Sequence, residues 1–262
     1  MDISIIIVNY KSKDKLENCL KSISESDLSG LNYEVIVVDN ASGDNLLDLN
    51  KIIDFKLIIS NVNLGMGGGN NLGIKESRGE FVLILNPDTV LRPQAIKILF
   101  EYIKKNDDVY IVGPKLLNPN LTLQYSCARF PRPWTPIFRR TFLGRFFKKH
   151  LDWFLLKDYS HDIIKEVDWM LGSCLLIRRY GFSGFDERFF MYFEDIDVCR
   201  RAWEEGKKVV YNPEAEVIHY HTRGSAQRPW YLSIFKDKLF REHLRSWWSY
   251  FRKWGLGRIK LK

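Results

Sequence analysis

The sequence predicts an α/β protein in which helices cover both faces of a doubly wound, mostly parallel sheet. Short β-branched runs alternate with segments of helical period over residues 3–112, beginning with Ile-Ser-Ile-Ile-Ile-Val at 3–8. These runs are continuously apolar, as is typical of strands buried on both faces of a parallel sheet. With 262 residues and 45% hydrophobic content, the chain is large enough for one such domain.

The predicted elements follow one another in a regular alternation. After the first strand we expect a helix at 13–26, a strand at 34–38, a helix at 43–51, a strand at 55–60, a helix at 68–77, a strand at 80–85, a helix at 93–105 and a strand at 109–112. Residues 118–165 are rich in proline, aromatic residues and arginine without a clean period, which indicates a long functional loop with short helices. Later we expect a strand at 174–178, an acidic helix at 194–205, a strand at 208–211 and a basic aromatic helix at 229–254.

Two segments carry the positive charge of the chain. The formal net charge is +8, yet residues 120–160 hold eight Lys or Arg against two Asp, and residues 236–262 hold nine against two acids. The rest of the chain is therefore slightly acidic. Such charge favours anionic partners, which include nucleic acid, an acidic membrane surface and phosphorylated small molecules.

Cysteine spacing and hydropathy indicate the compartment. Cys19, Cys127, Cys174 and Cys199 lie far apart and form no C-x-x-C pair. We therefore expect reduced thiols in a cytosolic protein, without a disulfide framework or a zinc knuckle. The N-terminus lacks the features of a signal peptide. Because no apolar run approaches the roughly 20 residues that span a bilayer, any membrane contact is predicted to be peripheral.

Polar residues stand where the predicted strands end. The first strand is followed by Asn9 and Tyr10, the second by Asp39, the third leads to Asn63, and the fourth ends in Asn86-Pro87-Asp88. In open α/β sheets, ligands bind beyond the carboxyl ends of the strands. The sequence therefore predicts a binding site at this edge, although such residues also terminate strands for purely structural reasons.

The segment 63–71, Asn-Leu-Gly-Met-Gly-Gly-Gly-Asn-Asn, resembles a phosphate cradle, because glycines let backbone N–H groups approach an anion. It matches neither the G-x-G-x-x-G dinucleotide fingerprint nor a Walker A loop. A flexible turn into the next helix is the structural alternative. Asn63, Gly65 and Asn71 are the candidate binding residues of this segment.

Two positions are candidate metal ligands. Asp88 follows a buried strand, where a lone carboxylate can hold a hard cation that also takes diphosphate oxygens. A turn or helix-cap role is the alternative for Asp88. His219 and His221 alternate along a predicted strand, so they would face a metal or phosphate from the same side. Ordinary surface or core histidines are the alternative there.

Carboxylates follow the aromatic run 189–193. Glu194, Asp195 and Asp197 open a predicted helix beside these rings, and an apolar environment raises carboxylate pKa values into the range that suits a general base. At helical spacing Glu194 and Asp197 share a face, whereas Asp195 points elsewhere. The alternative is an acidic first turn that the helix dipole favours.

Taken together, Ser-Ile-Ile-Ile-Val-Asn-Tyr at 4–10, Val-Val-Asp-Asn-Ala-Ser-Gly-Asp at 37–44, the glycine-rich segment and Leu-Asn-Pro-Asp at 85–88 resemble family 2 glycosyltransferases of the GT-A fold. Downstream, Gly172-Ser173-Cys174, Gly-Phe-Asp-Glu-Arg-Phe-Phe at 184–190 and Glu-Asp-Ile-Asp at 194–197 look like the rhamnosyltransferase branch of that family. The resemblance covers residues 3–222. It implies a GT-A domain at 1–228, with a nucleotide-binding half at 1–115 and an acceptor half at 116–228, followed by a basic aromatic helical tail at 229–262.

The resemblance also implies a role for each matching residue. Asp195 matches the catalytic base, and Glu194 beside it is the less favoured candidate. Asp88 and His219 would meet a divalent metal, Mg²⁺ or Mn²⁺, although Asn86-Pro87-Asp88 lacks the first carboxylate of the Asp-x-Asp that many relatives have. Asp39 would bind the nucleobase. Further donor contacts would come from Asn9, Tyr10, Asn63, Gly65, Asn71, Asn86 and Asp88.

The implied activity is inverting transfer of a sugar from a nucleotide-sugar donor, with L-rhamnose from dTDP-rhamnose as the first expectation and a UDP-sugar as the alternative donor. The acceptor would be a glycan or a polyprenyl-diphosphate-linked sugar, used in cell-surface polysaccharide synthesis at the inner face of the membrane. Two other classes stay open at this point. A nucleic-acid-binding module would explain the charge but not Asp39, Asp88 and Asp195, and a sugar nucleotidyltransferase would need a basic glycine-rich loop after the first strand.

With an acceptor carried on lipid, both basic aromatic segments acquire a role. We expect arginines of the first segment to meet acceptor phosphate, namely Arg129, Arg132, Arg139, Arg140 and Arg145. We expect aromatic residues of the tail to enter the interface of an anionic membrane, namely Trp247, Trp248, Phe251 and Trp254. A homodimer surface, or an ordinary helix packed on the core, is the alternative for the tail.

Overall fold

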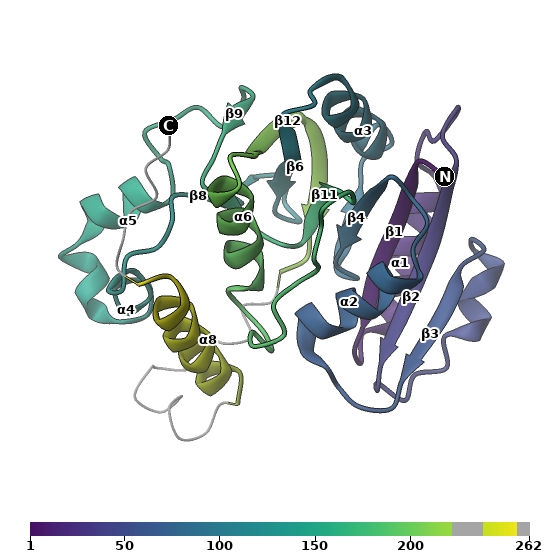
Figure 1. The fold of residues 1–262 in the computed structure, drawn as a ribbon, viewed down its shortest axis with the longest axis horizontal. Helices are drawn as coiled ribbons and strands as arrows, with labels where there is room; N and C mark the ends of the chain where they lie inside the picture. The colour runs from purple at the N-terminus through teal and green to yellow at the C-terminus, as the bar shows by residue number, and fades with distance from the viewer. Residues whose placement is uncertain (222–237, 256–262) are drawn as a thin grey trace.

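The computed structural model describes residues 1–221 and 238–255. Within them, ten strands form one mixed sheet (Figure 1). Its main strands are β1 (Ile3–Asn9), β2 (Tyr33–Asn40), β3 (Lys56–Ser60), β4 (Phe81–Leu85), β5 (Thr89–Leu91), β6 (Val109–Leu117), β11 (Cys174–Arg178) and β12 (Lys208–His219), in the spatial order β3-β2-β1-β4-β11-β6-β12-β5. Two short strands, β7 (Leu123–Gln124) and β9 (Lys165–Glu166), pair with β6 and β12. A separate two-stranded sheet joins β8 (Cys127–Ala128) to β10 (Trp169–Met170).

The parallel part of the sheet aligns the strand ends. Strands β3, β2, β1 and β4 run parallel, whereas β11 runs antiparallel to β4 and to β6, and β5 runs antiparallel to β12. In the register of β1 and β2, Asn9 lies beside Asp39. The predicted doubly wound, mostly parallel architecture is confirmed, with β11, β5 and the two-residue strands β7 and β9 as its antiparallel members.

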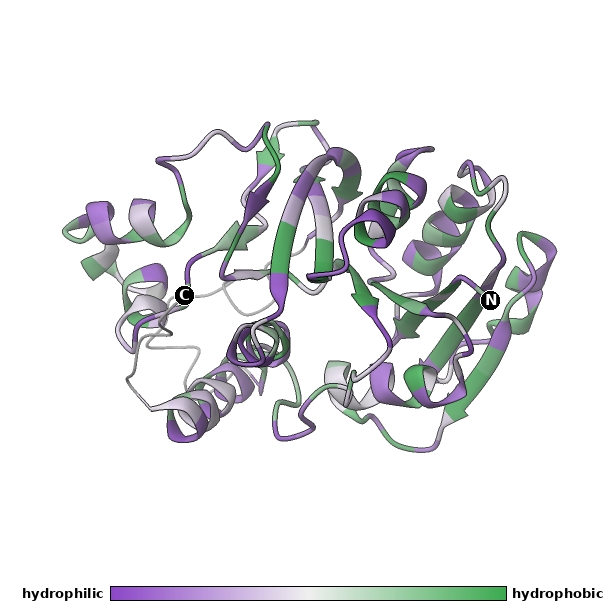
Figure 2. Cartoon of the chain, turned by 45° about the horizontal axis from the view of Figure 1, so that its top comes forward, coloured by the Kyte–Doolittle hydropathy of each residue, from purple (hydrophilic) through white to green (hydrophobic). Residues whose placement is uncertain are grey.

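Helices cover both faces of the sheet, because alternate residues of each strand point to opposite sides. On one face Ile3, Ile5 and Ile7 pack with α1 (Lys13–Ser24), the 3₁₀ helix η1 (Leu47–Lys51) and α3 (Ala95–Lys105). On the other face Ile6 and Val8 belong to the core that includes α2 (Gly65–Glu76), α6 (Glu194–Glu204) and α8 (Lys238–Trp254). Hydrophobic colour marks the strands between these layers (Figure 2).

A group of short helices extends the molecule at the end opposite β3 (Figure 1). It consists of α4 (Thr135–Arg140), the 3₁₀ helix η2 (Phe142–Arg145) and α5 (Lys148–Phe154). These helices fall in the proline-rich segment 118–165, where the sequence predicts a long loop with short helices. That prediction is confirmed.

Several element boundaries differ from the sequence prediction. The expected helix at 43–51 is only η1, because residues 42–44 are held in a loop by hydrogen bonds to the ends of β1 and β2. The expected strand at 208–211 continues to His219, since a register irregularity between Asn212 and Glu216 lets β12 pass a segment that reads as a break. Residues 229–237 of the expected tail helix lie outside the described residues. The boundary predicted at residue 115 falls within β6, and the sheet is continuous across it.

Candidate active site

The ends of β1 and β2 form a polar network suited to a nucleobase. Asn9 is fully buried and donates through Nδ2 to Ser42 Oγ at 3.1 Å and to Asp44 Oδ2 at 2.9 Å. The Ser42 backbone N–H donates to Asp39 Oδ1 at 3.2 Å, and its hydroxyl donates to the same oxygen. Every hydrogen bond of the Asp39 carboxylate within the described residues uses Oδ1, so Oδ2 is available to a ligand N–H. Tyr10 stands beside this network with 45% of its surface exposed.

The glycine-rich segment forms the first turns of α2, where its leading backbone donors are already satisfied. Asn63 Oδ1 accepts from the Gly65 N–H at 2.9 Å and from Asn40 Nδ2 at 3.1 Å. The Met66 N–H donates to the Phe190 carbonyl at 2.9 Å. At these two donors the phosphate-cradle hypothesis is wrong, because protein oxygens occupy them.

Close packing explains the glycine at position 65. Gly65 has φ +75°, and a Cβ atom there would lie 2.0 Å from the Phe190 carbonyl oxygen. The side chain of Asn71 reinforces the same contact, because its Nδ2 donates to the Phe185 carbonyl at 2.9 Å and its Oδ1 accepts from the Phe185 N–H at 2.8 Å. Gly65 and Asn71 thus fasten α2 to the segment 185–190, and the amide of Asn71 is engaged there rather than at the strand ends.

Asp88 and His219 meet although they are distant in sequence. Strand β5 pairs with β12 so that Thr89 lies opposite His219, which brings His219 Nε2 to 3.4 Å from Asp88 Oδ1. Lys15 Nζ lies 3.8 Å from Asp88 Oδ2. Burial acts to raise the pKa of Asp88, but the hydrogen bond and charge of His219 and the charge of Lys15 outweigh it and lower that pKa. Asp88 is therefore an ionised carboxylate beside an imidazole.

The carboxylate of Asp88 and the imidazole of His219 provide part of a coordination shell for a divalent cation. Among residues 1–221 and 238–255, no three His, Cys, Asp or Glu side chains gather as a complete metal cage. Asp88 and His219 supply one oxygen and one nitrogen, and Gln124 Oε1 lies 2.7 Å from His219 Nδ1, where it can fix the ring with Nε2 directed at Asp88. Two protein ligands suit Mg²⁺ or Mn²⁺ when substrate phosphate and water complete the coordination. The ring of His221 lies 5.2 Å from that of His219.

Asp195 stands at the N-terminus of α6 and is partly exposed. Its Oδ2 accepts from the Gly172 N–H at 3.1 Å and its Oδ1 from the Ile196 N–H at 2.8 Å. Burial raises the pKa of Asp195 to about 6, against the opposing effect of these backbone hydrogen bonds. Burial also raises the pKa of Glu194, and the charge of Asp195 adds to that effect. Oε2 of Glu194 is buried and has no partner among the described residues, so this environment favours the protonated form of Glu194.

Residues 172 and 173 connect Asp195 to the end of β4. Because β11 runs antiparallel to β4 with Cys174 opposite Leu85, the residues before β11 pass the carboxyl end of β4. The Ser173 backbone carbonyl accepts the Asn86 N–H at 2.9 Å, while the backbone N–H of the adjacent Gly172 donates to Asp195 Oδ2. Through this link the structure brings the Asn86–Asp88 segment and the Glu194–Asp195 pair to one place.

Helix α8 supports the segment that precedes Asp195, a role that the sequence did not reveal. Tyr192 and Phe193 have φ of 70° and 68°, a left-handed conformation that is costly for aromatic residues. Ser246 donates its hydroxyl to the Met191 carbonyl at 2.9 Å, and the His243 ring lies 4.9 Å from that of Tyr192. We infer that α8 holds this strained turn in place.

A buried ionic cluster attaches the end of α8 to α6. Asp197 is fully buried, with Lys253 Nζ at 2.7 Å, Trp254 Nε1 at 2.8 Å and Arg201 Nε at 3.0 Å. Lys253 also lies 2.8 Å from Asp186. In the sequence only the i, i+4 spacing of Asp197 and Arg201 hints at this cluster.

The structure corrects the prediction that four aromatic residues of the tail enter a lipid interface. Trp247 donates to the Pro133 carbonyl at 3.0 Å, Trp254 donates to Asp197, and Phe251 packs on the core. Trp248 alone among the four is mostly exposed, at 64%. The apolar face of α8 is covered by the protein itself because the helix docks on α6. Among residues 1–221 and 238–255, no helix has both the length and the apolar character that crossing a bilayer requires.

The arginines expected at an acceptor phosphate are partly engaged within the protein. Arg129 pairs with Asp158 at 3.2 Å, and the Arg132 guanidinium lies 4.6 Å from the Trp153 ring centroid. Arg139 lies 5.5 Å from the ring of Phe154. The side chain of Arg140 lies outside what the structure describes.

The family profile and the relatives that this chain matches are all glycosyltransferases. The sequence profile of Glycosyl transferase family 2 matches residues 4–167. A Low-salt glycan biosynthesis hexosyltransferase (Agl10) of Haloferax volcanii is 34% identical over 83% of this chain and 67% of its own length. An N-acetylglucosaminyl-diphospho-decaprenol L-rhamnosyltransferase of Mycobacterium tuberculosis is 27% identical over 86% of this chain and 78% of its own. Rhamnosyltransferase WbbL of Escherichia coli is 28% identical over 94% and 91%.

Solved structures show the same fold at low sequence identity. GalNAc-T7, solved with UDP, GalNAc and Mn²⁺, superposes with a TM-score of 0.65 at 16% identity and covers 84% of this chain. Residues 1–349 of TarS from S. aureus, solved with UDP, superpose with a TM-score of 0.59 at 18% identity and cover 85% of this chain. The chain spans 44% of the GalNAc-T7 chain and 61% of the TarS chain, so the likeness extends to only part of each.

Proposed function

The chain belongs to glycosyl transferase family 2, and on this premise we propose that it is an inverting enzyme that transfers L-rhamnose from dTDP-rhamnose to a sugar carried on a polyprenyl diphosphate. Two relatives named as rhamnosyltransferases, each matched over most of both chains, support the donor. The name of the mycobacterial relative supports the acceptor class. The product would enter cell-surface polysaccharide.

The link between residues 172–173 and the two carboxylate segments is the observation that carries this proposal. A transferase must place the leaving diphosphate and the attacking hydroxyl on opposite sides of one anomeric carbon. Asp88 and Asp195 would meet this need, and support comes from the loop that accepts the Asn86 N–H and also donates to Asp195. We propose that residues 1–115 supply most of the donor side and residues 116–228 most of the acceptor side of this shared site, with Ser173 and His219 also contributing to the donor side.

The donor would lie across the carboxyl ends of the parallel strands. Asp39 Oδ2 would accept an N–H of the base, with Asn9 and Tyr10 lining the same pocket. Asn86 Oδ1 and Ser173 Oγ are buried without partners among the described residues. Buried polar atoms of this kind are usually paired, and sugar hydroxyls of the bound donor would pair them.

The proposed reaction is a single displacement. Asp195 removes the proton from an acceptor hydroxyl while that oxygen forms a bond to the anomeric carbon and the bond to the diphosphate breaks on the opposite face, so the configuration inverts. The raised pKa of Asp195 makes it a stronger base than an exposed aspartate. The partial exposure of Asp195 lets an acceptor reach it.

Asp88 and His219 would hold a divalent cation, which would supply neutralisation of the charge that grows on the leaving diphosphate. Lys15, 3.8 Å from Asp88, is a second positive charge at this place. The Mn²⁺ and UDP bound by GalNAc-T7 support a metal in a protein of this fold.

A thermal-shift panel of dTDP-rhamnose, UDP-N-acetylglucosamine and UDP-glucose, each with Mn²⁺, Mg²⁺ or EDTA, tests the donor. A ligand at 100 times its dissociation constant stabilises the folded state by about 2.7 kcal/mol, which corresponds to a rise in Tm of about 5–10 °C. We expect this rise with dTDP-rhamnose and metal, and its loss in Asp88→Ala. A metal-dependent shift with the UDP-sugars alone would instead favour transfer of a glucosyl or N-acetylglucosaminyl group, a second candidate with which the 34% identity to a relative named as a hexosyltransferase also agrees.

Asp48→Ala is the matched control for Asp88→Ala, because Asp48 is an exposed carboxylate that pairs with Lys13 away from Asp88. It should keep the full nucleotide shift. If Asp88→Ala also kept it, Asp88 would not hold the metal. Product formed from the donor that binds is then analysed by NMR, where retention of the anomeric configuration would contradict the single displacement.

A further inference from the structure

Exposed apolar side chains gather on the short helices at the end of the molecule opposite β3. Phe142 and Phe146 are 63% and 76% exposed. Together with three other exposed residues they form what we term the docking face, which comprises Trp134, Ile137, Phe142, Phe146 and Phe147. Large apolar side chains that cluster at a surface mark an interaction site, whereas single ones need no explanation.

The charge around the docking face has one sign. Residues 129–151 hold seven Lys or Arg and no Asp or Glu. Within the described part of the chain, Arg145, Lys148 and Lys149 take part in no ion pair with an acidic side chain. These three cations are interleaved with Phe146 and Phe147 in the sequence, so charge and apolar surface occupy the same helices.

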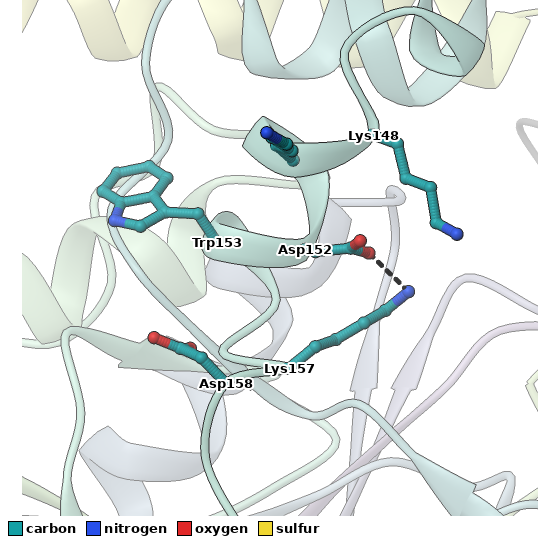
Figure 3. Close-up of a pocket in the computed structure, with 6 residues that line it drawn as sticks. Lys148, Asp152, Trp153, Lys157 and Asp158 are labelled. Carbon is teal, nitrogen blue, oxygen red and sulfur yellow. Dashed lines mark ion pairs between the residues drawn. The ribbon is translucent and has the colours of Figure 1, made fainter.

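A shallow pocket of about 550 Å³ lies at α5, and two of its lining residues, Lys148 and Lys149, directly follow Phe147 of the docking face in the sequence. Lys148 and Lys149 line it together with Lys157, Asp152 and Asp158 (Figure 3). Both acids are already neutralised, since Asp152 lies 2.7 Å from Lys157 and Asp158 lies 3.2 Å from Arg129. The pocket therefore presents the two unpaired lysines to an anion.

We propose that the docking face binds the surface of an anionic phospholipid bilayer, with Phe142 and Phe146 inserted among the acyl chains and Arg145, Lys148 and Lys149 at the headgroups. Exposed apolar and cationic side chains on the same short helices suit the boundary between headgroups and hydrocarbon. A second copy of the chain is a poor occupant, because a two-fold contact would bring the same cationic surface against itself. Nucleic acid would leave the most exposed phenylalanines without an apolar environment.

The docking face is connected to the catalytic segment. Trp247 of α8 donates to Pro133, directly before α4, and Ser246 of the same helix donates to Met191 before Asp195. Docking would thus hold the acceptor side of the enzyme close to the bilayer. The benefit of holding the acceptor side near the bilayer rests on the proposed lipid-linked acceptor, whereas the binding of the docking face to vesicles does not depend on it.

Co-sedimentation of the full chain with vesicles tests the inference without any activity measurement. We expect binding to vesicles containing 30% phosphatidylglycerol and weak binding to pure phosphatidylcholine. The double variant Phe142→Ser/Phe146→Ser and the double variant Lys148→Glu/Lys149→Glu should each lower the partition coefficient by about tenfold or more, because each lysine and each inserted ring contributes separately. Their thermal melts should match the wild type, since the four side chains are largely exposed.

Two control variants change exposed residues of the same kind, apolar to serine and lysine to glutamate, outside the docking face. Leu47→Ser/Tyr180→Ser removes apolar side chains that are 64% and 90% exposed, and Lys51→Glu/Lys105→Glu reverses two exposed charges. Both should bind vesicles like the wild type. Equal loss in controls and test variants, or equal binding to neutral and anionic vesicles, would overturn the proposal. So would a dimer in light scattering that Phe142→Ser/Phe146→Ser converts to a monomer, or binding to an oligonucleotide that vesicles fail to displace.

Discussion

Asp195→Asn is expected to lower kcat by about 10²–10⁴-fold, the usual contribution of a general base. The amide keeps the shape of the side chain and can still accept a backbone N–H, but it cannot take a proton from an acceptor hydroxyl. Donor binding should persist, because the proposed role of Asp195 is toward the acceptor hydroxyl and not the donor. Initial rates at varied donor and acceptor concentrations give kcat and both KM values, and a thermal shift with the donor shows that the variant is folded.

The pH dependence of the wild type should follow the same group. Since Asp195 acts as a base only when ionised, activity should rise with pH through about 6, where burial places its pKa. Stability should move the other way. Because folding raises the pKa of Asp195, the folded state binds this proton more tightly than the unfolded state does. The resulting contribution to the free energy of unfolding is present below the unfolded pKa of about 4 and is lost as pH rises through about 6. In Asp195→Asn both dependences should flatten over this range.

Glu194→Gln is the matched control, because it changes the neighbouring carboxyl in the same way. Burial and the charge of Asp195 raise the pKa of Glu194, and its Oε2 has no partner in the described structure. The amide has the shape of the protonated carboxyl that this environment favours, and we expect less than about a tenfold loss of kcat. If Glu194→Gln abolished turnover and Asp195→Asn did not, the roles of the two carboxyls would have to be exchanged.

The strand ends could be predicted from the sequence because each buried strand is a continuous apolar run with a visible end. Asn9, Asp39, Asn86 and Asp88 follow such ends, and parallel pairing alone brings them to one edge. Asn63, Gly65 and Asn71 were predicted as binding residues because the glycine-rich segment 63–71 resembles a phosphate cradle. In the structure Asn63 precedes α2, whereas Gly65 and Asn71 belong to it, and hydrogen bonds to Asn40 and to the segment 185–190 use their polar groups.

Contacts that depend on distant pairings could not be predicted in this way. His219 reaches Asp88 only because β12 continues beyond its irregularity and pairs with β5, a three-residue strand that has no signal of its own. The burial of α8 is a similar case. A basic aromatic helix has the same composition whether it lies on a membrane or on its own domain, and only the cluster at Asp197 decides between the two.

Lys253→Met is expected to destabilise the fold by about 3 kcal/mol. Removing one partner of a buried ion pair leaves the other charge uncompensated, at a typical cost of about 3–5 kcal/mol, and the lower end applies because Asp197 keeps Arg201 and Trp254. The pKa of Asp186 is lowered mainly by Arg188 and, against burial, by Lys253. The lowered pKa of Asp186 stabilises the fold above its unfolded pKa of about 4, and this stabilisation is lost as the pH falls further. The free energy of unfolding of Lys253→Met should therefore fall less on acidification than that of the wild type. Urea unfolding at pH 7 and pH 4 measures both effects.

The same variant tests whether α8 positions the catalytic base. If α8 holds the left-handed turn at Tyr192 and Phe193, loss of the ion pairs at the C-terminal end of α8 should lower kcat more than it raises KM for the donor. The reason is that the proposed donor contacts come from other elements. Lys253→Arg, which retains the charge, should recover most of the kcat. Lys21→Met is the stability control, since Lys21 forms an exposed pair with Glu17 and its loss should cost less than about 0.5 kcal/mol. A large destabilisation by Lys253→Met with unchanged kcat would limit α8 to a purely structural role, whereas a fall in kcat that Lys253→Arg reverses would connect the buried cluster to the position of Asp195.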